Sequence, residues 1–188
     1  SNNQKQILYL DGIRLHRALV SGIQKVISRQ DYLNKINVFP VPDCDTGTNM
    51  AFTLTAILDR TTSQIHSKVS DMLMVTADAA LDGARGNSGV ILAQFFQGIS
   101  DGTENLTRMS TENFSHAIQV GSEYAREALA EPKEGTILTV LSDFSDHLIN
   151  QINLGVNDFV TLMKSGIEKA EESLKNTPNL LPVLKKAG

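Results

Sequence analysis

The chain has 188 residues, of which 41% are hydrophobic and 20% charged, and its formal net charge is −4 at pH 7. These values predict one folded domain, 1–188, with a sizeable core, and the acidic balance argues against a nucleic-acid-binding surface. The single cysteine, Cys44, excludes an internal disulfide, and the lack of a signal peptide or long apolar run predicts a soluble cytoplasmic protein without a membrane span.

Apolar residues recur at helical spacing from one end of the chain to the other. The first stripe covers 15–26, and further helices are expected near 48–60, 68–82, 88–99, 114–128, 136–152 and 159–174. Asn157 and Asp158 are expected to form the cap and first turn of the last one. Sustained alternation of period two is lacking, and aromatic residues make up only 5%. The sequence therefore predicts an all-α fold of roughly seven or eight helices joined by short loops.

The stretch 37–50 reads Asn-Val-Phe-Pro-Val-Pro-Asp-Cys-Asp-Thr-Gly-Thr-Asn-Met and is the most informative part of the chain. Asp43 and Asp45 lie one residue apart, and in extended backbone such residues point to the same side. Two converging carboxylates repel unless a cation lies between them, and Mg²⁺ combines one or two carboxylates with water and phosphate oxygens. The run 51–58 is expected to open as a helix capped by Thr48 or Asn49, whose start offers N–H groups to an anion. Metal–nucleotide chemistry is therefore predicted.

Three glycine-containing segments lead directly into apolar helices. They are 46–49 (Thr-Gly-Thr-Asn), 85–89 (Arg-Gly-Asn-Ser-Gly) and 133–136 (Lys-Glu-Gly-Thr). Glycine lets the backbone approach a ligand closely, and hydroxyl and N–H groups at helix starts bind phosphate oxygens. Three such segments in an all-α chain indicate one end of a bundle built around a polyanion.

Other phosphate and metal motifs fit less well. The segment 83–88 lacks the Gly-Lys step of a Walker A loop. An EF-hand that begins at Asp43 fails because Thr48 replaces the glycine and Leu54 the bidentate glutamate. A haloacid-type phosphatase needs its Asp-x-Asp after a buried strand, and Pro40 and Pro42 rule out a central strand there.

These motifs resemble a known family. The segments 37–50, 83–92 (Gly-Ala-Arg-Gly-Asn-Ser-Gly-Val-Ile-Leu), 134–140 (Glu-Gly-Thr-Ile-Leu-Thr-Val) and 176–185 (Asn-Thr-Pro-Asn-Leu-Leu-Pro-Val-Leu-Lys) are similar to the nucleotide-binding subunit of dihydroxyacetone kinases. The closer resemblance is to the amino-terminal domain of bacterial fatty acid kinase ATP-binding proteins. It implies an eight-helix antiparallel barrel with ATP or ADP and two Mg²⁺ ions at one end. It also implies a separate fatty-acid-binding partner of the DegV type and an acyl phosphate product.

The resemblance also implies roles for individual residues. Asp43 and Asp45 match the magnesium carboxylates, and Asn37 lies where a third ligand is expected. The positions that match phosphate contacts are Thr46, Gly47, Thr48, Asn49, Gly86, Asn87, Ser88 and Gly89. Gly135, Thr136 and Ile137 match a helix start that contacts the nucleotide, with Ile137 and Leu138 beside adenine. Arg85 is the candidate for stabilising charge on the transferred phosphoryl group.

The chain departs from the family pattern in two places. Cys44 replaces the glycine usually found between the aspartates, and a positive φ there would strain a cysteine. The chain also stops at Gly188, where relatives continue into an acidic, glycine-rich segment and further domains. We therefore expect a piece of a longer protein, and the full-length protein is a candidate homodimer.

Simpler interpretations stay open for several residues. An Asp-x-Asp pair in a proline-containing loop is often a turn or a helix cap. Arg85 has Asp82 as an alternative partner, and the 133–136 segment alone is typical of a helix cap. For the whole protein, the alternatives are the nucleotide subunit of a dihydroxyacetone-type kinase and a non-catalytic nucleotide-sensing module.

Overall fold

The computed structural model of the chain describes residues 5–36, 46–131 and 137–180. The helices of these residues are α1 (Gly12–Ser28), α2 (Gln30–Ile36), α3 (Thr46–Ser63), α4 (Val69–Asp82), α5 (Gly86–Asp101), α6 (Thr111–Glu127), α7 (Ile137–Asn153) and α8 (Phe159–Leu180). β1 (Tyr9–Leu10) and β2 (Met109–Ser110) form a two-stranded antiparallel sheet in which Tyr9 pairs with Ser110. The described residues thus have the all-α fold that the sequence predicts.

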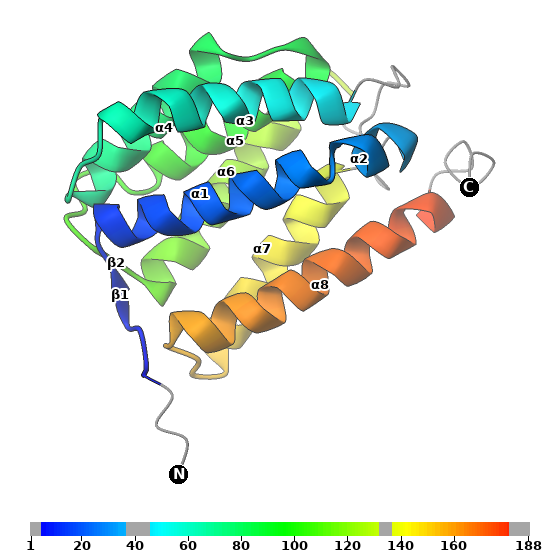
Figure 1. The fold of residues 1–188 in the computed structure, drawn as a ribbon. Helices are drawn as coiled ribbons and strands as arrows, with labels where there is room; N and C mark the ends of the chain where they lie inside the picture. Colours follow the sequence, from blue (N-terminus) through cyan, green and yellow to red (C-terminus); the bar gives the residue numbers. More distant parts are fainter. Residues whose placement is uncertain (1–4, 37–45, 132–136, 181–188) are drawn as a thin grey trace.

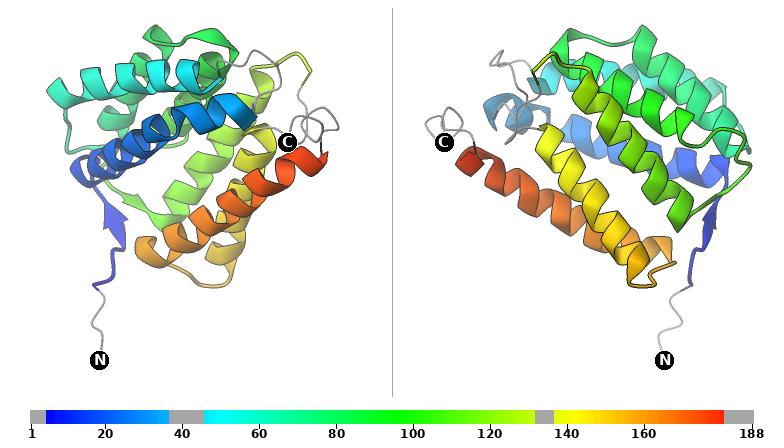
Figure 2. Two further views of the ribbon diagram at one scale, coloured as in Figure 1. Left: turned by 45° about the vertical axis from the view of Figure 1, so that its right-hand side comes forward. Right: turned by 180° about the vertical axis from the view of Figure 1, so that it is seen from behind.

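Helices that are consecutive in the chain lie side by side from α3 to α8 and run in alternating directions (Figures 1 and 2). α1 packs against α3 and α4, and α3 also contacts α5. Because each turn reverses the chain, the starts of α3, α5 and α7 come to one end of the bundle, on the right in Figure 1. The starts of α1, α6 and α8 lie at the opposite end.

Two groups of buried apolar side chains hold the helices together. The larger one includes Ile57, Leu148 and Leu162, which have no exposed surface. Burial of each such side chain contributes roughly 1.5–3 kcal/mol to folding. The smaller group joins Met50, Ile91, Ala125 and Leu138 near the starts of α3 and α7. No helix in the described ranges is both long and apolar enough to cross a membrane.

α5 and α6 approach each other especially closely because two glycines face each other. A Cβ atom added to Gly98 would lie 2.7 Å from Cα of Gly121 and 2.7 Å from the carbonyl oxygen of Val120. Neither helix can accept a side chain at this crossing without moving. The pair therefore fixes the separation of α5 and α6.

Three of the helix starts at one end of the bundle, those of α1, α6 and α8, carry side-chain caps, while the first N–H groups of α4 donate to backbone carbonyl oxygens of Leu106 and Thr107. The Asp11 carboxylate accepts from the N–H of Arg14 at 2.8 Å, and Ser110 and Asn113 form a reciprocal capping box on α6. Asp158 accepts from the N–H of Thr161 at 2.9 Å and from the N–H of Ile7 at 2.7 Å, so the cap of α8 is Asp158, the second residue of the predicted pair, and the first turn begins at Phe159. Each cap satisfies N–H groups that the helix itself leaves unpaired.

Two features differ from the sequence prediction. α2 is a separate helix of seven residues that no stripe predicted. α3 begins at Thr46, so Thr48 and Asn49 lie inside its first turn and the prediction that either caps the helix was wrong. The physical reason is that Thr48 bonds to α2 instead, through Asn34.

Candidate functional site

The described part of the predicted site lies at the end of the bundle where α3, α5 and α7 begin. It comprises Thr46, Gly47, Thr48, Asn49, Arg85, Gly86, Asn87, Ser88, Gly89 and Ile137. The predicted metal ligands Asn37, Asp43 and Asp45 lie outside the described residues, as do Cys44, Gly135 and Thr136. The roles predicted for these residues stay predictions.

The first turns of α3 and α5 contact each other directly. The Ser88 hydroxyl donates to the carbonyl oxygen of Thr46 across 3.5 Å, and the N–H of Arg85 donates to Thr53 Oγ1 across 3.3 Å. Thr53 in turn donates to the carbonyl oxygen of Asn49 at 3.0 Å. Two segments that are far apart in the sequence therefore form one surface.

The contact between the starts of α3 and α5 is so close that it requires a residue without a side chain at Gly86. Its φ is +68°, in the left-handed region that favours glycine. A Cβ atom at this position would lie 2.4 Å from Nδ2 of Asn49, whose side chain is almost fully buried. Asn49 therefore supports the backbone of the α5 start, and both positions constrain each other.

α2 holds the first turn of α3 from the other side. Thr48 donates its N–H to Asn34 Oδ1 at 3.0 Å, and its hydroxyl accepts from Gln30 Nε2 and Asn34 Nδ2, both at 3.1 Å. A Cβ atom on Gly47 would lie 2.1 Å from the carbonyl oxygen of Gln30. Thr48 thus has only its hydroxyl proton left for a ligand, and Gly47 serves the packing of α2 on α3.

The α5 start differs from the capped helix starts because no side chain caps it. Arg85 occupies the N-cap position without a side-chain hydrogen bond. In the described ranges, the N–H groups of Gly86, Asn87 and Ser88 have no acceptor, and the first bond of the helix runs from Gly89 N–H to Arg85 oxygen at 3.1 Å. Gly86 and Asn87 are exposed. This helix start can accept an anion without losing an existing cap.

Arg85 is exposed and does not pair with Asp82. Its guanidinium carbon lies 5.0 Å from the ring centroid of Phe52, an exposed residue of α3. Asp82 instead accepts from Arg60 at 2.7 Å. Arg85 is thus held over an aromatic ring beside the α5 start, and no described carboxylate neutralises its charge.

The start of α7 adds an apolar surface to this end. Ile137 is half-buried and packs on the group that contains Met50, Ile91 and Leu138. Ile137, Met50 and Leu141 also line an apolar groove of about 350 Å³ between α1, α2, α3, α7 and α8. Leu138 is almost fully buried, whereas Ile137 and Leu141 are half-buried and have surface to offer a ligand.

Sequence reasoning missed the residues that support the site. Gln30 and Asn34 lie one turn apart on a helix too short for a periodic signal, and Thr53 lies one turn after Asn49. No three acidic, histidine or cysteine side chains of the described ranges are placed to hold a metal ion. A metal site at this end would therefore depend on the predicted ligands at 43 and 45.

The geometry defines an all-α domain in which two glycine-containing helix starts, far apart in sequence, share one surface. Residues 40–188 match the DAK2 domain. An uncharacterized protein of Staphylococcus saprophyticus is 38% identical over 179 residues, which is 95% of this chain and 32% of that protein. An uncharacterized protein of Staphylococcus aureus strain USA300 is 39% identical over 170 residues, covering 90% of this chain and 31% of that protein.

The chain therefore belongs to the DAK2 domain family, the dihydroxyacetone kinase family. This is a kinase-related family, which agrees with the phosphate-binding interpretation of the helix starts. The chain spans about a third of the length of these curated relatives.

Proposed function

We propose that this chain is the ATP- and Mg²⁺-binding phosphoryl-transfer domain of a fatty acid kinase. The observation that supports it best is the uncapped start of α5 beside the first turn of α3. Backbone N–H groups at a helix start, together with the helix dipole, favour a phosphate group. Membership of the DAK2 family supports the kinase class.

In this proposal the phosphates lie against the N–H groups of Gly86, Asn87 and Ser88. The purine lies beside Ile137, whose apolar neighbours Met50 and Leu141 border the groove described above. Asp43 and Asp45, with Asn37 as a third ligand, hold Mg²⁺. Bound Mg²⁺ supplies charge neutralisation at the phosphate oxygens, which this acidic chain needs in order to bind a nucleotide.

The reaction needs little from the protein beyond position and charge. An oxygen of the fatty acid carboxylate forms a bond to the γ-phosphorus of ATP, while the bond from that phosphorus to the β–γ bridging oxygen breaks. ADP and an acyl phosphate result. A carboxylate is already deprotonated at neutral pH, so no general base is required. Arg85, the N-cap residue of α5, is proposed to stabilise the transferred group.

The acceptor is proposed from the motifs at 37–50 and 176–185, which resemble the fatty acid kinases more closely than other members of the family. The fatty acid would arrive on a separate binding protein of the DegV type. Because the relatives are about three times as long as this chain, turnover is proposed for the full-length protein.

A dihydroxyacetone-type kinase subunit is the second candidate, favoured by the match to the DAK2 domain over 40–188. The two candidates share the nucleotide site and differ in the acceptor. Full-length protein mixed with ATP and either a fatty acid on its DegV-type partner or dihydroxyacetone on its binding subunit would separate them. ADP release only with the fatty acid supports the first candidate, and release only with dihydroxyacetone overturns it.

The nucleotide site itself is tested by calorimetry of ATP binding with Mg²⁺. Asp43→Ala and Asp45→Ala are each expected to abolish Mg²⁺-dependent binding, because removal of one ligand leaves the other carboxylate without a shared cation. Asp59→Asn, on the exposed side of α3, is the control for loss of one negative charge. Unchanged ATP affinity in both alanine variants would refute the metal assignment.

A further inference from the structure

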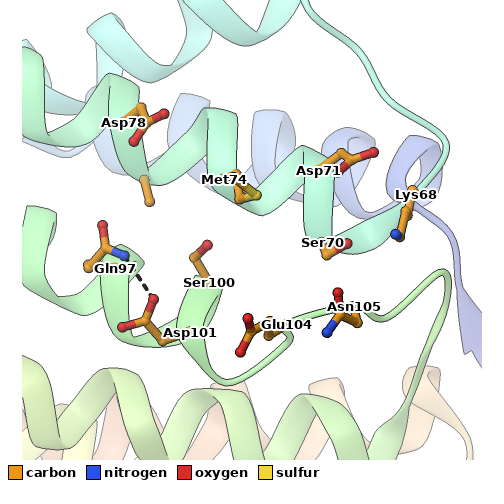
Figure 3. A pocket seen from close by; sticks show the side chains of 11 residues that line it. Lys68, Ser70, Asp71, Met74, Asp78, Gln97, Ser100, Asp101, Glu104 and Asn105 are labelled. Carbon is orange, nitrogen blue, oxygen red and sulfur yellow. Dashed lines mark hydrogen bonds between the residues drawn. The ribbon is translucent and has the colours of Figure 1, made fainter.

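A second cavity lies at the far end of α5 from the candidate nucleotide site. It has a volume of about 370 Å³ and lies between α4, the last turn of α5 and the loop that follows (Figure 3). At about 1.5 Å per residue, more than 20 Å of helix separates Asp101 from Gly86. We call this cavity the acidic groove.

The acidic groove carries a strong excess of negative charge. Its lining includes four carboxylates, Asp71, Asp78, Asp101 and Glu104, against one ammonium group, Lys68. In the described ranges no ion pair joins Lys68 to any of them. The end of α5 adds the negative pole of the helix to the same side. The excess negative charge of the groove is therefore available to attract a bound cation.

Asp101 is held in place with its charge intact. One carboxylate oxygen accepts from Gln97 Nε2 at 2.9 Å and the other accepts from the Tyr124 hydroxyl at 2.7 Å. The hydrogen bond to Asp101 raises the pKa of Tyr124, so both donors are neutral at physiological pH. Neither donor cancels the negative charge, and together they fix the direction of the carboxylate.

Two serine side chains of residues more than nine-tenths buried point into the groove without partners. Ser70 on α4 is 6% exposed and Ser100 on α5 is 7% exposed, and Figure 3 shows both side chains directed into the cavity. Neither hydroxyl has a hydrogen-bond partner in the described ranges, although the N–H of Ser70 donates to Leu106 oxygen. Unlike Ser145 Oγ, these two oxygens are not fully enclosed, so each is open to a hydrogen bond from a ligand or water in the groove.

The groove is unsuited to an anion or a metal ion. The first N–H groups of α4, those of Val69 and Ser70, already donate to the carbonyl oxygens of Thr107 and Leu106. The carboxylates are spread along the groove, and no three acidic, histidine or cysteine side chains of the described ranges are placed to hold a metal ion. An extended organic cation needs neither free N–H groups nor three converging ligands. Its charged head can lie between carboxylates while its apolar stem lies along another part of the groove.

We propose that the acidic groove is a binding site for an aliphatic ammonium group, with the charged head between Asp78 and Asp101 and the stem along Met74. Met74 is 57% exposed and Ala77 lies beside it in the lining, so this wall offers apolar surface to methylene groups. About 12 Å of helix axis separates Ser70 from Asp78, which suits an extended chain. The ammonium group comes either from a free polyamine or from a lysine side chain of a partner protein.

The test uses spermidine and the blocked peptide acetyl-Gly-Lys-Gly-amide as probes of these two sources. Each is titrated into the protein at low salt, with binding followed by calorimetry and by amide chemical shifts in NMR spectra. We expect saturable binding, with shifts concentrated at Ser70, Asp78 and Ser100. Tighter binding of the peptide assigns a protein side chain as the source, and tighter binding of spermidine assigns a free amine.

Matched variants separate a site from general attraction to an acidic surface. Asp78→Asn is expected to weaken binding about fivefold, whereas Asp59→Asn on α3 leaves it unchanged. Both side chains are exposed and have no partner in the described ranges, so the two variants should fold alike. Equal weakening in both variants, or shifts spread over the whole surface, would overturn the proposal.

Ser100→Ala gives an independent readout. If the Ser100 hydroxyl contacts only the ligand, its removal should lower the affinity for the probes, while the thermal midpoint of the unliganded protein stays the same or rises. If the hydroxyl instead stabilises the fold, its removal should lower the thermal midpoint and leave the affinity for both probes unchanged. That second result, or the absence of binding by both probes, contradicts the proposal.

Discussion

The two ends of this bundle begin their helices in different ways. At one end Asp11, Ser110 and Asp158 cap α1, α6 and α8 with short hydrogen bonds. At the other end α5 begins with Gly86 at positive φ and no side-chain cap. Uncapped N–H groups are costly when they are left without partners. α4 also starts at the first end without a side-chain cap, but backbone carbonyl oxygens of Leu106 and Thr107 accept from its first N–H groups. The lack of acceptors at the α5 start in the described ranges supports the proposal that a ligand binds there.

The capped end also ties distant parts of the chain together. β1 pairs with β2, the Phe114 and Phe159 rings meet edge to face at 5.8 Å, and Asp158 bonds to Ile7. Substitutions at this end should change stability without changing nucleotide affinity. Substitutions at the α3 and α5 starts should lower nucleotide affinity, and the following predictions test that division from the largest expected effect to the smallest.

Gly86→Ala should have the largest effect because it combines backbone strain with a clash. Positive φ costs an alanine about 1–2 kcal/mol, and the new Cβ would displace the buried Asn49 amide. We expect ATP affinity with Mg²⁺, measured by calorimetry, to fall at least about tenfold.

Gly155→Ala is the matched control. Gly155 also has positive φ, +93°, but a Cβ atom there would meet nothing within 4 Å. This variant should lose about 1–2 kcal/mol of unfolding free energy and keep its ATP affinity. Equal affinity in the two glycine variants would show that the α5 start does not contact the nucleotide.

Asp158→Asn should destabilise the capped end by about 1–2 kcal/mol at pH 7, because one carbonyl oxygen replaces two carboxylate oxygens. Burial raises the pKa of Asp158, but hydrogen bonds from Ile7, Thr161 and Val160 outweigh it and lower the pKa below its ordinary 3.8. The carboxylate therefore stabilises the fold above that pH, and this contribution is lost as pH falls through the lowered value.

Urea denaturation at pH 7 and at pH 3 or below checks this prediction. The difference in unfolding free energy between the native chain and Asp158→Asn should shrink as the pH falls below 3.8. A difference that stays constant with pH would mean that the carboxylate charge does not stabilise the cap. ATP affinity should be the same for both proteins at pH 7.

Ser88→Ala should lower ATP affinity about threefold to tenfold while changing the unfolding free energy by about 0.5 kcal/mol or less. Within the described ranges its hydroxyl makes one hydrogen bond, to the carbonyl oxygen of Thr46, and this bond is long at 3.5 Å, so little is lost from the fold. Ser145→Ala is the control, because this buried hydroxyl on α7 has no hydrogen-bond partner in the described ranges. It should leave affinity unchanged and keep or raise stability.

Gly22→Ala should have the smallest effect and the opposite sign. Gly22 lies inside α1, and a Cβ atom there would meet nothing within 4 Å. Alanine in a helix interior is favoured over glycine by roughly 0.5–1 kcal/mol. Thermal unfolding should show a higher midpoint with unchanged ATP affinity, and a lower midpoint would contradict the open space at this position.

Much of the fold followed from the sequence because long amphipathic helices give a strong periodic signal. The stripes at 15–26 and 159–174 lie inside α1 and α8, and the expected helix at 68–82 nearly coincides with α4. The sequence did not predict α2 because its seven residues contain too few turns to show a period. The two-residue strands escaped because pairing between them depends on tertiary contacts that no local pattern carries.

The candidate site was predicted unevenly for the same reason. The glycine-containing segments at 46–49 and 85–89 do come together, as the family resemblance implied. The sequence did not distinguish positions that face outward, such as Gly86 and Asn87, from those that pack on α2, such as Gly47. That distinction depends on which helix lies opposite each residue, and no local pattern contains it.

The hydrogen bonds from α2 to Thr48 determine which shortened forms of this domain keep the α3 start supported. The family match begins at residue 40, yet Gln30 and Asn34 brace the α3 start, and Ile23 lies in the main core. A shortened protein trimmed to the matched span would lose α1 and α2 and uncover the face of α3 that they shield. A shortened protein that begins before Ile7 would keep α1 and α2 packed on α3.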